Sequence, residues 1–333
     1  MAVRIGINGF GRIGRYLVRL LAHETALEVV MVNARADNEA LAHLLKYDSV
    51  HGTYPGEVKA TADGFSIDGK EIVVTRQPIG QWNWKDGNID LVIESSGAVK
   101  DKAGLAKHID CGAKKVIISA PGVDVDLTVV MGVNHELYDP ATHHVVSTAS
   151  CTTNCMAPAV KLVNDAYGIK HGQMTTIHSY TMSQRILDGS HKDLRRGRAA
   201  AMSIVPTTTG AAKAVTMVIP ELAGKLDGMS MRVPTPNVSL VDLVCELERP
   251  VTVQEVNAML KAAAEGPMQG YMGYTEIPLV SVDYTGNENG GVVDGLLTHV
   301  MNGTQLKLVI WYDNESSFTH QLLRFMKLVA KDL

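Results

Sequence analysis

The chain has 333 residues, of which 46% are hydrophobic and 20% are charged, and its formal net charge at pH 7 is −4. Single hydrophobic cores stop growing near about 250–300 residues, so this length predicts two domains. The composition excludes a disordered or fibrous chain, and the slight negative charge argues against a protein built to bind nucleic acid.

The cysteines and the hydropathy of the chain bear on whether the protein is secreted, metal-binding or membrane-bound. Only four cysteines occur, Cys111, Cys151, Cys155 and Cys245, and no C-x-x-C pair is present. This pattern predicts neither a disulfide framework nor a zinc site, and we expect no metal. The first residues lack a signal-peptide pattern, and no apolar run approaches the ~20 residues that span a bilayer. We therefore expect a cytoplasmic protein with reduced thiols and no membrane attachment.

The first 150 residues alternate between short apolar strands and helical periodicity. We expect strands at 3–8, 28–33, 90–94, 115–119 and 145–147, and helices at 12–23, 40–47 and 101–111. Such alternation predicts parallel β-α-β units in an α/β, Rossmann-type doubly wound sheet over residues 1–150. Sheets of this type bind ligands at the carboxyl ends of their strands.

The pattern changes after residue 150. We expect a helix at 151–167, strands at 173–181, 229–233, 238–248 and 305–313, a basic irregular segment at 185–198, and turns at Gly290–Gly291 and Asn302–Gly303. This predicts an α+β domain over 151–314 with a mixed or antiparallel sheet. The amphipathic stretch 315–333 predicts a final helix, which we expect to pack back on the first domain.

A glycine motif opens the chain. Gly9-Phe10-Gly11-Arg12-Ile13-Gly14 fits G-x-G-x-x-G, follows an expected strand and begins an expected helix. In dinucleotide sites the first glycine makes the tight turn, the second lets the backbone approach the pyrophosphate and the third allows close packing. The helix N-terminus then offers N–H groups to the phosphates. A glycine turn without a ligand is the alternative interpretation.

The end of the second strand bears on the choice between NAD and NADP. NAD sites usually carry Asp or Glu about 20 residues beyond the glycine motif, bonded to the ribose 2′-hydroxyl. Ala34 has no carboxylate to repel a 2′-phosphate, Arg35 is a nearby cation, and Asp37 lies beyond the expected strand. These residues favour NADP, alone or with NAD. Alternatively, Arg35 points to solvent and backbone groups hold an NAD ribose.

Cys151 is the candidate nucleophile. Ser150 is a good helix N-cap, so Cys151 falls in the first turn, where the helix dipole favours a thiolate. Cys155, one turn deeper, would feel less of this effect. A buried structural cysteine is the alternative. His178 is the candidate base, because its expected strand can return to the start of the Cys151 helix; a lone histidine on a strand is, however, often structural.

Basic and hydroxyl side chains predict anion binding in the second half. The cluster comprises Arg185, Lys192, Arg195, Arg196 and Arg198. Thr207-Thr208-Thr209-Gly210 precedes an expected helix, and Arg232 lies in an otherwise apolar strand, where an unpaired cation is costly. Small phosphates suit such isolated arginines, whereas nucleic acid would need a wider basic face. A solvated loop is the alternative for the cluster.

Several long motifs together resemble phosphorylating glyceraldehyde-3-phosphate dehydrogenases over nearly the whole chain. They are INGFGRIGR, LLKYDSVHG, STASCTTNC, HSYT, HKDLRRGR, TTTGAAKAV, GMSMRVPTPNVS and WYDNE. The resemblance implies a dinucleotide-binding domain, a catalytic domain, a homotetramer, and triose phosphate and inorganic phosphate as substrates. A catalytically silent protein of the same fold is the competing class, but it would be expected to lack some of these groups.

The resemblance also implies roles for individual residues. Cys151 would attack the aldehyde and His178 would act as base. Thr181 and Arg232 would hold the substrate phosphate. The attacking phosphate would be held by Ser150, Thr152, Arg195, Thr209 and Gly210. Asn314 would bond the carboxamide of the nicotinamide. Further cofactor-binding positions would be Asn8, Gly9, Phe10, Gly11, Arg12, Ile13, Ala34, Arg35, Arg76, Ser96, Gly97, Ser119 and Ser190.

Three departures from the family pattern refine these expectations. Ala34 stands where NAD-specific members carry Asp, and Gly189-Ser190 stands where many carry Leu-Pro. A serine there resembles the NADP-using members, in which it reaches the 2′-phosphate from a neighbouring subunit, so NADP or dual use is favoured. Phe318 replaces the usual tyrosine and resembles erythrose-4-phosphate dehydrogenase, the alternative enzyme. Thr208-Thr209-Gly210, however, matches the triose-phosphate enzyme.

Overall fold

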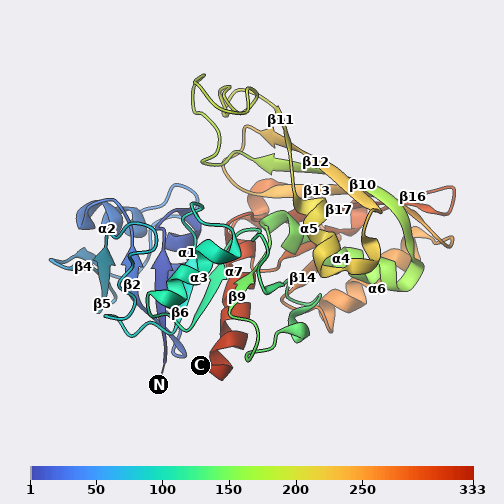
Figure 1. The fold of residues 1–333 in the computed structure, drawn as a ribbon. Helices are drawn as coiled ribbons and strands as arrows, with labels where there is room; N and C mark the ends of the chain where they lie inside the picture. Colours follow the sequence, from blue (N-terminus) through green and yellow to red (C-terminus); the bar gives the residue numbers. More distant parts are fainter. Residues whose placement is uncertain (1) are drawn as a thin grey trace. The chain divides into compact units, whose positions relative to one another are not determined.

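The computed structural model describes residues 2–333 and separates the chain into two compact units, drawn in Figure 1. The first unit contains the residues up to Val129, together with Glu136–Ala149 and Leu322–Leu333. The second unit contains Val130–His135 and Ser150–Gln321. Each unit is built around its own sheet.

The first unit holds a nine-stranded sheet in the order β3-β4-β5-β2-β1-β6-β7-β9-β8. Its strands are β1 (Val3–Asn8), β2 (Leu27–Asn33), β3 (Val58–Ala60), β4 (Gly64–Ile67), β5 (Lys70–Thr75), β6 (Leu91–Glu94), β7 (Lys115–Ile118), β8 (Leu127–Thr128) and β9 (Val145–Ser147). From β5 through β8 every neighbouring pair is parallel, whereas β3, β4 and β5 pair antiparallel. The expected Rossmann-type sheet is confirmed, with an antiparallel extension at one edge.

Three helices connect the parallel strands. They are α1 (Arg12–Leu21), α2 (Asn38–Lys46) and α3 (Lys102–Asp110). The carboxylate of Asp37 accepts from the N–H of Ala40 at the start of α2, and Asp101 accepts from Gly104 at the start of α3. Such caps satisfy N–H groups that have no partner within the helix. The helices therefore begin where the chain leaves the carboxyl ends of the strands.

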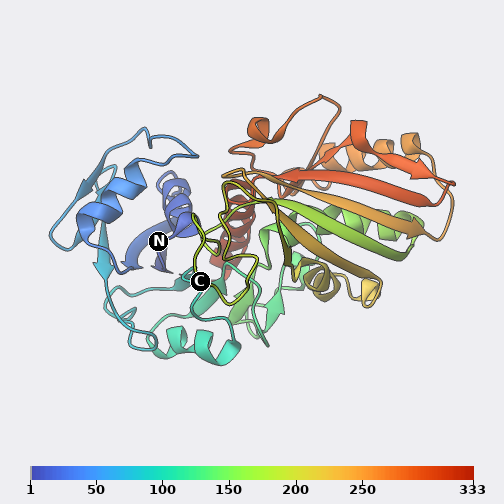
Figure 2. The same ribbon diagram turned by 90° about the horizontal axis from the view of Figure 1, so that it is seen from above.

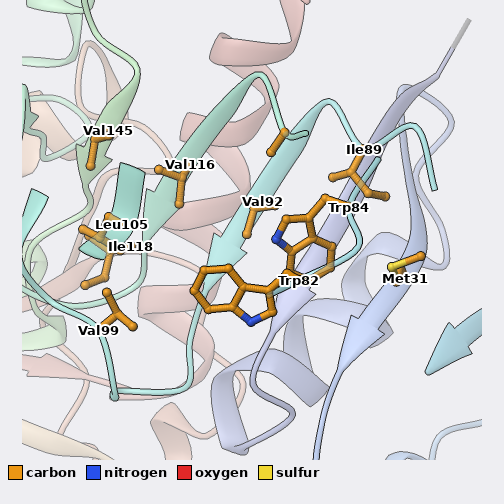
Figure 3. Close-up of a cluster of buried hydrophobic side chains, with 11 residues drawn as sticks. Met31, Trp82, Trp84, Ile89, Val92, Val99, Leu105, Val116, Ile118 and Val145 are labelled. Carbon is orange, nitrogen blue, oxygen red and sulfur yellow. The ribbon is translucent and has the colours of Figure 1, made fainter. Parts of the chain in front are cut away.

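Apolar side chains from several strands, from helix α3 and from the segment that carries Trp82 and Trp84 form a core cluster on one side of this sheet. Figure 3 shows Val92 beside the indole rings of Trp82 and Trp84, and Leu105 beside Ile118 in the same cluster. Trp84 is fully buried, and a Cβ at Gly6 would lie 3.0 Å from its ring, so a glycine in β1 makes room for the indole.

The second unit holds an eight-stranded mixed sheet in the order β11-β12-β10-β13-β17-β15-β14, with β16 beside β17. Its strands are β10 (Ile169–Ser179), β11 (Val205–Thr208), β12 (Leu226–Val233), β13 (Ser239–Leu247), β14 (Met272–Thr275), β15 (Gly291–Asp294), β16 (His299–Met301) and β17 (Gln305–Tyr312). Two pairs, β10 with β12 and β14 with β15, are parallel, and the other pairs are antiparallel. Figure 2 shows the long strands of this sheet side by side.

Helices α4 (Cys151–Tyr167), α5 (Ala211–Val218) and α6 (Val253–Glu265) lie along one face of this sheet in Figure 1. The expected bounds of α4 are confirmed, and so is the mixed sheet. Gly291, expected in a turn, instead begins β15. A Cβ at Gly291 would lie 2.5 Å from the carbonyl oxygen of Cys155, so this glycine serves close packing against α4 rather than a turn.

The final helix is shorter than expected. Helix α7 (Ser316–Val329) is followed by a 3₁₀ turn at Ala330–Asp332. Its first turns, up to Gln321, belong to the second unit, where the Gln321 amide donates to the carbonyls of Gly270 and Glu288. From Leu322 onward the helix belongs to the first unit. None of the helices within residues 2–333 combines the length and apolar character needed to cross a membrane.

Candidate active site

Cys151 is the first residue of α4. The chain leaves β9, and Ala149, fully buried, adopts a left-handed conformation with φ +56°. Ser150 then caps the helix, since its hydroxyl accepts from the N–H of Thr153 at 3.1 Å. The sharp turn and the cap place the half-buried thiol of Cys151 in the first turn, beside N–H groups that stabilise negative charge.

His178 faces this thiol from the end of β10. The distance from Cys151 Sγ to His178 Nε2 is 3.6 Å, and His178 is only 4% exposed. The long strand that follows α4 thus returns to the helix start, as expected from the sequence. A thiol and an imidazole in contact can exchange a proton, which is the first requirement of nucleophilic catalysis by cysteine.

Arg232 is a cation that lies beside this pair. It lies opposite His178 in the parallel register of β10 and β12. Its Nη1 lies 2.7 Å from His178 Nδ1 and donates to the carbonyl oxygen of Ser179 at 3.0 Å. His178 Nδ1 also lies 2.7 Å from that carbonyl. Because Arg232 can only donate, a hydrogen bond from Nη1 to Nδ1 belongs to the tautomer with its proton on Nε2. In the other tautomer Nδ1 donates to Ser179, the lone pair of Nε2 points at the Cys151 sulfur, and His178 can take the thiol proton.

Burial and Arg232 set the charges of the pair. Burial and the Arg232 charge lower the pKa of His178 to about 3. Burial raises the pKa of the Cys151 thiol, while Arg232 and the N–H and hydroxyl of Thr152 lower it. His178 is therefore a neutral base, and the same cation that keeps it neutral stabilises negative charge on the sulfur.

Tyr312, the last residue of β17, packs against His178. The ring of Tyr312 meets His178 edge to face, with ring centroids 5.9 Å apart. Its buried hydroxyl is hydrogen-bonded to the hydroxyls of Thr152 at 2.8 Å and Thr176 at 2.9 Å. The hydroxyl of Thr152, a residue expected to hold phosphate, is therefore hydrogen-bonded to Tyr312.

Asn314 follows β17 and is held by two serines. Its Oδ1 accepts from the hydroxyls of Ser179 at 2.7 Å and Ser239 at 2.9 Å. Ser239 also accepts from the N–H of Ser179. Both acceptor directions of the amide oxygen are thus used, so the amide nitrogen is the end that can donate to a ligand.

The expected phosphate ligands lie on the loops of the same unit. The hydroxyl of Thr181 is bonded to Ser183, and that of Thr209 accepts from the N–H of Ala211. Gly210 is the N-cap residue of α5. Arg195 is exposed, whereas its neighbour Arg196 donates to the hydroxyl of Thr207.

In the first unit, the glycine motif forms an open turn at the start of α1. Gly9 has φ +99°, and a Cβ there would lie 2.5 Å from the backbone nitrogen of Ser96. A Cβ at Gly14 would lie 2.4 Å from the Gly9 carbonyl oxygen. A Cβ at Gly11, in contrast, would meet no atom within 4 Å. The outer two glycines serve packing, and the middle one leaves space beside the helix N-terminus.

The other expected cofactor residues stand at the carboxyl ends of the neighbouring strands. Asn8 ends β1, Ala34 and Arg35 follow β2, Arg76 follows β5, Ser96 and Gly97 follow β6, and Ser119 follows β7. Phe10 and Ile13 belong to the glycine turn, and Ser190 lies on an exposed loop of the second unit. The Arg12 guanidinium pairs with the Asp48 carboxylate, which lowers the pKa of Asp48.

Comparison with known proteins decides the family. Residues 3–102 match the model of the "Glyceraldehyde 3-phosphate dehydrogenase, NAD binding domain", and residues 150–314 match that of the C-terminal domain of the same family. The chain is 55% identical to a glyceraldehyde-3-phosphate dehydrogenase of Geobacillus stearothermophilus over 332 residues, covering 99% of both chains. It is 54% identical to glyceraldehyde-3-phosphate dehydrogenase 1 of Bacillus subtilis, also over 99% of both.

The chain belongs to the glyceraldehyde-3-phosphate dehydrogenase family. It is thus an oxidoreductase with a nicotinamide-binding domain. Among residues 2–333, no group of His, Cys, Asp or Glu side chains is arranged to hold a metal ion.

Sequence reasoning on this glyceraldehyde-3-phosphate dehydrogenase family member missed the residues that hold the site in place. Tyr312 and Ser239 were not proposed as site residues, although both lie within quoted family motifs, WYDNE and GMSMRVPTPNVS. The sequence offered one clue to these two residues: each lies at the end of a strand that borders an expected site residue or its motif. Only the fold shows that the ends of β10, β13 and β17 meet.

Proposed function

We propose that this protein oxidises and phosphorylates glyceraldehyde 3-phosphate to 1,3-bisphosphoglycerate, reversibly, through a thioester on Cys151. The observation that carries the proposal is the 3.6 Å contact between Cys151 Sγ and His178 Nε2 at the N-terminus of α4. The family membership supplies the substrate class. A nicotinamide cofactor would supply the hydride acceptor when bound.

The residues present support each protein-borne step. Cys151 Sγ attacks the aldehyde carbon while its proton passes to His178 Nε2, and the resulting N–H stabilises the new oxyanion. His178 Nε2 returns this proton to the oxyanion, which gives the hemithioacetal hydroxyl. The neutral imidazole then takes the hydroxyl proton as hydride leaves the same carbon, which yields a thioester. Inorganic phosphate attacks the thioester carbonyl carbon, the C–S bond breaks, and the acyl phosphate departs while the sulfur regains its charge or proton.

Two anion sites are needed, one for each phosphate. We assign Thr181 and Arg232 to the substrate phosphate, and Ser150, Arg195, Thr209 and Gly210 to the attacking phosphate. The hydroxyl of Thr152 is paired with Tyr312. We therefore propose that Thr152 binds the attacking phosphate through its backbone N–H, which also donates to the Cys151 sulfur. The buried Nε of Arg232 has no partner within residues 2–333, which supports a role in holding an anion.

The first unit fits a dinucleotide. The space at Gly11, at the N-terminus of α1, suits a pyrophosphate. In the second unit, the oriented amide of Asn314 suits a carboxamide oxygen. We propose that NADP is used, alone or with NAD. Ala34 is buried and carries no carboxylate, and the Arg76 guanidinium lies close by, bonded to the carbonyl of Ala36 and to Asn38.

We further propose a cytoplasmic homotetramer in which Ser190 serves the cofactor of a neighbouring subunit. The loop that carries Ser190 exposes six large apolar side chains. They are Met182 (91%), Ile186 (84%), Leu187 (73%), Leu194 (85%), Met202 (80%) and Ile204 (67%). Such a patch favours burial against another protein surface, and its place on the site-bearing loop favours a second copy of this chain.

Initial rates test the proposed function. The assay contains glyceraldehyde 3-phosphate with and without inorganic phosphate, and NAD and NADP are varied separately. We expect phosphate-dependent turnover and a kcat/KM with NADP equal to or above that with NAD. A strong NAD preference would show that backbone groups hold the ribose at Ala34. Higher kcat/KM with erythrose 4-phosphate would favour the alternative enzyme suggested by Phe318.

A further inference from the structure

A chain of buried polar side chains crosses the carboxyl end of the first sheet and connects two expected cofactor-binding residues, Asn8 and Ser96, to residues that were not expected in the site. Its centre is Glu94, the last residue of β6, which is 1% exposed. One carboxylate oxygen accepts from the N–H of Ser96 at 2.7 Å and from its hydroxyl at 2.5 Å. The other accepts from the Asn8 amide at 2.5 Å and contacts His108 Nε2 at 3.0 Å.

The chain continues from Asn8 toward the other edge of the sheet. Asn8 Oδ1 accepts from the Asn33 amide nitrogen at 2.8 Å. Asn33 Oδ1 in turn accepts from the hydroxyl of Thr75 and from the N–H of Gln77. The strands that carry these residues lie in the order β5-β2-β1-β6, so the network spans four neighbouring strand ends.

The other end of the network lies in the core of Figure 3. Trp84 Nε1 donates to His108 Nδ1 at 2.9 Å, so His108 Nε2 carries a proton and donates to Glu94. The His108 ring is fully buried and stacks on Trp82 with centroids 3.7 Å apart. A neutral histidine of this tautomer satisfies both contacts.

The direction of every hydrogen bond in this chain is determined. Two backbone N–H groups, those of Gln77 and Ser96, can only donate, and they stand near opposite ends. The side chains of Asn33 and Asn8 are therefore oriented with their amide oxygens toward Gln77 and their amide nitrogens toward Glu94. The Glu94 side chain accepts four hydrogen bonds. An ionised carboxylate can accept all four, whereas an amide could not, because its NH₂ group only donates. These hydrogen bonds lower the pKa of Glu94 despite its burial.

We propose that this network, with Glu94 at its centre, is a positioning device that holds four dinucleotide-binding loops in one arrangement, and that Asn33, Glu94, His108 and Trp84 govern cofactor affinity without touching the cofactor. It links the turn after Asn8, the segment after Asn33, the segment after Thr75 and the loop at Ser96. The inference rests on the assignment of these loops to the cofactor under the proposed function.

Glu94→Gln is the direct test, because it preserves shape and replaces one acceptor oxygen with an NH₂ group that faces two donors. Cofactor Kd is measured by titration calorimetry of the full protein at pH 7. We expect the Kd for both NAD and NADP to rise about 10- to 100-fold, the range that corresponds to lost hydrogen bonds to a charged group. At saturating cofactor, kcat should stay within about twofold of the wild type, because the Cys151–His178 contact lies in the other unit.

Matched variants separate positioning from stability and from the site assignment. Lys115→Met removes a buried cation that donates to the carbonyls of Pro140 and His143 in the same unit, away from the network. It should lower Tm and leave Kd unchanged. Gly11→Val fills the open space at α1 directly. If Gly11→Val binds dinucleotide normally, the loop assignment fails. If only Gly11→Val weakens binding and Glu94→Gln does not, the network proposal is overturned.

Coupling along the network is tested by a double-mutant cycle. Asn33→Leu and Glu94→Gln are separated by Asn8, so independent sites would give additive changes in log Kd. We expect the double variant to lose less cofactor affinity than the sum of the losses in the two single variants, because either substitution alone already frees the loops. Additive losses would overturn the coupling. Should Glu94→Gln not fold, His108→Phe, which keeps the ring on Trp82, replaces it; a Kd matching the wild type would then contradict the proposal.

Discussion

Tyr312, whose ring packs edge-on against His178, carries a hydroxyl that joins the buried hydroxyls of Thr152 and Thr176. Tyr312→Phe keeps the ring and leaves these two groups short of a partner. We expect unfolding free energy to fall by about 1–3 kcal/mol, measured by denaturant unfolding.

A second tyrosine provides the control for this prediction. The buried hydroxyl of Tyr284 has no hydrogen-bond partner within residues 2–333. Tyr284→Phe should therefore cost clearly less than Tyr312→Phe. Equal losses for the two variants would contradict the role given to the Tyr312 hydroxyl.

Glu94 should make the first unit sensitive to acid. Its hydrogen bonds lower its pKa in the folded state below the value of about 4.3 that an unfolded chain shows. The folded state then binds fewer protons than the unfolded state, so this stabilisation is complete above about pH 4.3 and is lost as pH falls through the folded pKa. The stability difference between wild type and Glu94→Gln, measured by thermal unfolding from pH 7 downward, should shrink in that range. A constant difference would show that Glu94 does not titrate between the two states.

At the residue scale, the sequence predicted that Cys151 and His178 would meet, but it did not predict the residues that support them. Cys151 follows a cap residue and His178 lies on the next strand, so both signals are local in the chain. Tyr312 lies 160 residues from Thr152, and Asn8 lies 86 residues from Glu94. Polar side chains at such separations show their partners only once the strand order is known.

The ends of strands β10, β13 and β17 orient Asn314. Directly before β13, Val238 adopts a left-handed conformation with φ +66°, which is strained for a β-branched residue, and Ser239 follows with its hydroxyl on Asn314. Ser239→Ala should let the amide rotate and lower kcat/KM with NADP or NAD about tenfold, the effect of one lost hydrogen bond of about 1.4 kcal/mol. With a cofactor analogue that lacks the carboxamide, the loss should vanish.

Ser230→Ala is the control for the Ser239 variant. Ser230 is also a buried serine on a strand of the same sheet, and its hydroxyl has no partner within residues 2–333. Its kinetics should match the wild type with both cofactors. An equal loss with the natural cofactor and the analogue would show that Ser239 does not act through Asn314.

Elements with strong local signals were predicted well, and the others were not. Strand β9 and helix α4 have the expected bounds, because a short apolar run and a capped apolar helix need no distant partner to be recognised. Strands β3 and β5 and helix α6 were missed. β3 is mostly exposed, β5 shows little apolar alternation, and α6 buries only three residues, so hydrophobic periodicity is weak in each.

The assembly should depend on the apolar loop that follows β10. Leu194 is 85% exposed on that loop, and a charge there would be buried at the proposed subunit contact. Leu194→Glu should shift the protein from a tetramer to smaller species in analytical ultracentrifugation. Because Ser190 is proposed to serve a neighbouring subunit, the Kd for NADP should rise more than that for NAD.

Leu137→Glu provides a matched change on the other unit, where Leu137 is 61% exposed. This variant should sediment as the wild type does. If Leu194→Glu remains tetrameric, or dissociates without loss of NADP affinity, the loop is not the shared surface that we propose.

The whole chain was predicted as two domains with a break near residue 150, from its length and from the change of pattern there. The sequence could not show that α7 divides at Gln321 between the two units, or that Val130–His135 belongs to the second. Both depend on which apolar surfaces meet, and hydrophobic periodicity alone does not identify the partner of a buried face.

The measurement that tests the thioester mechanism most directly is a single turnover without inorganic phosphate. Enzyme is mixed with glyceraldehyde 3-phosphate and oxidised cofactor, reduced cofactor is followed by absorbance, and the protein is digested for mass spectrometry. We predict a burst of reduced cofactor equal to the number of subunits, an acyl group on Cys151, and steady turnover once phosphate is added. Steady oxidation without phosphate, or a burst with no acyl group on Cys151, would contradict the account.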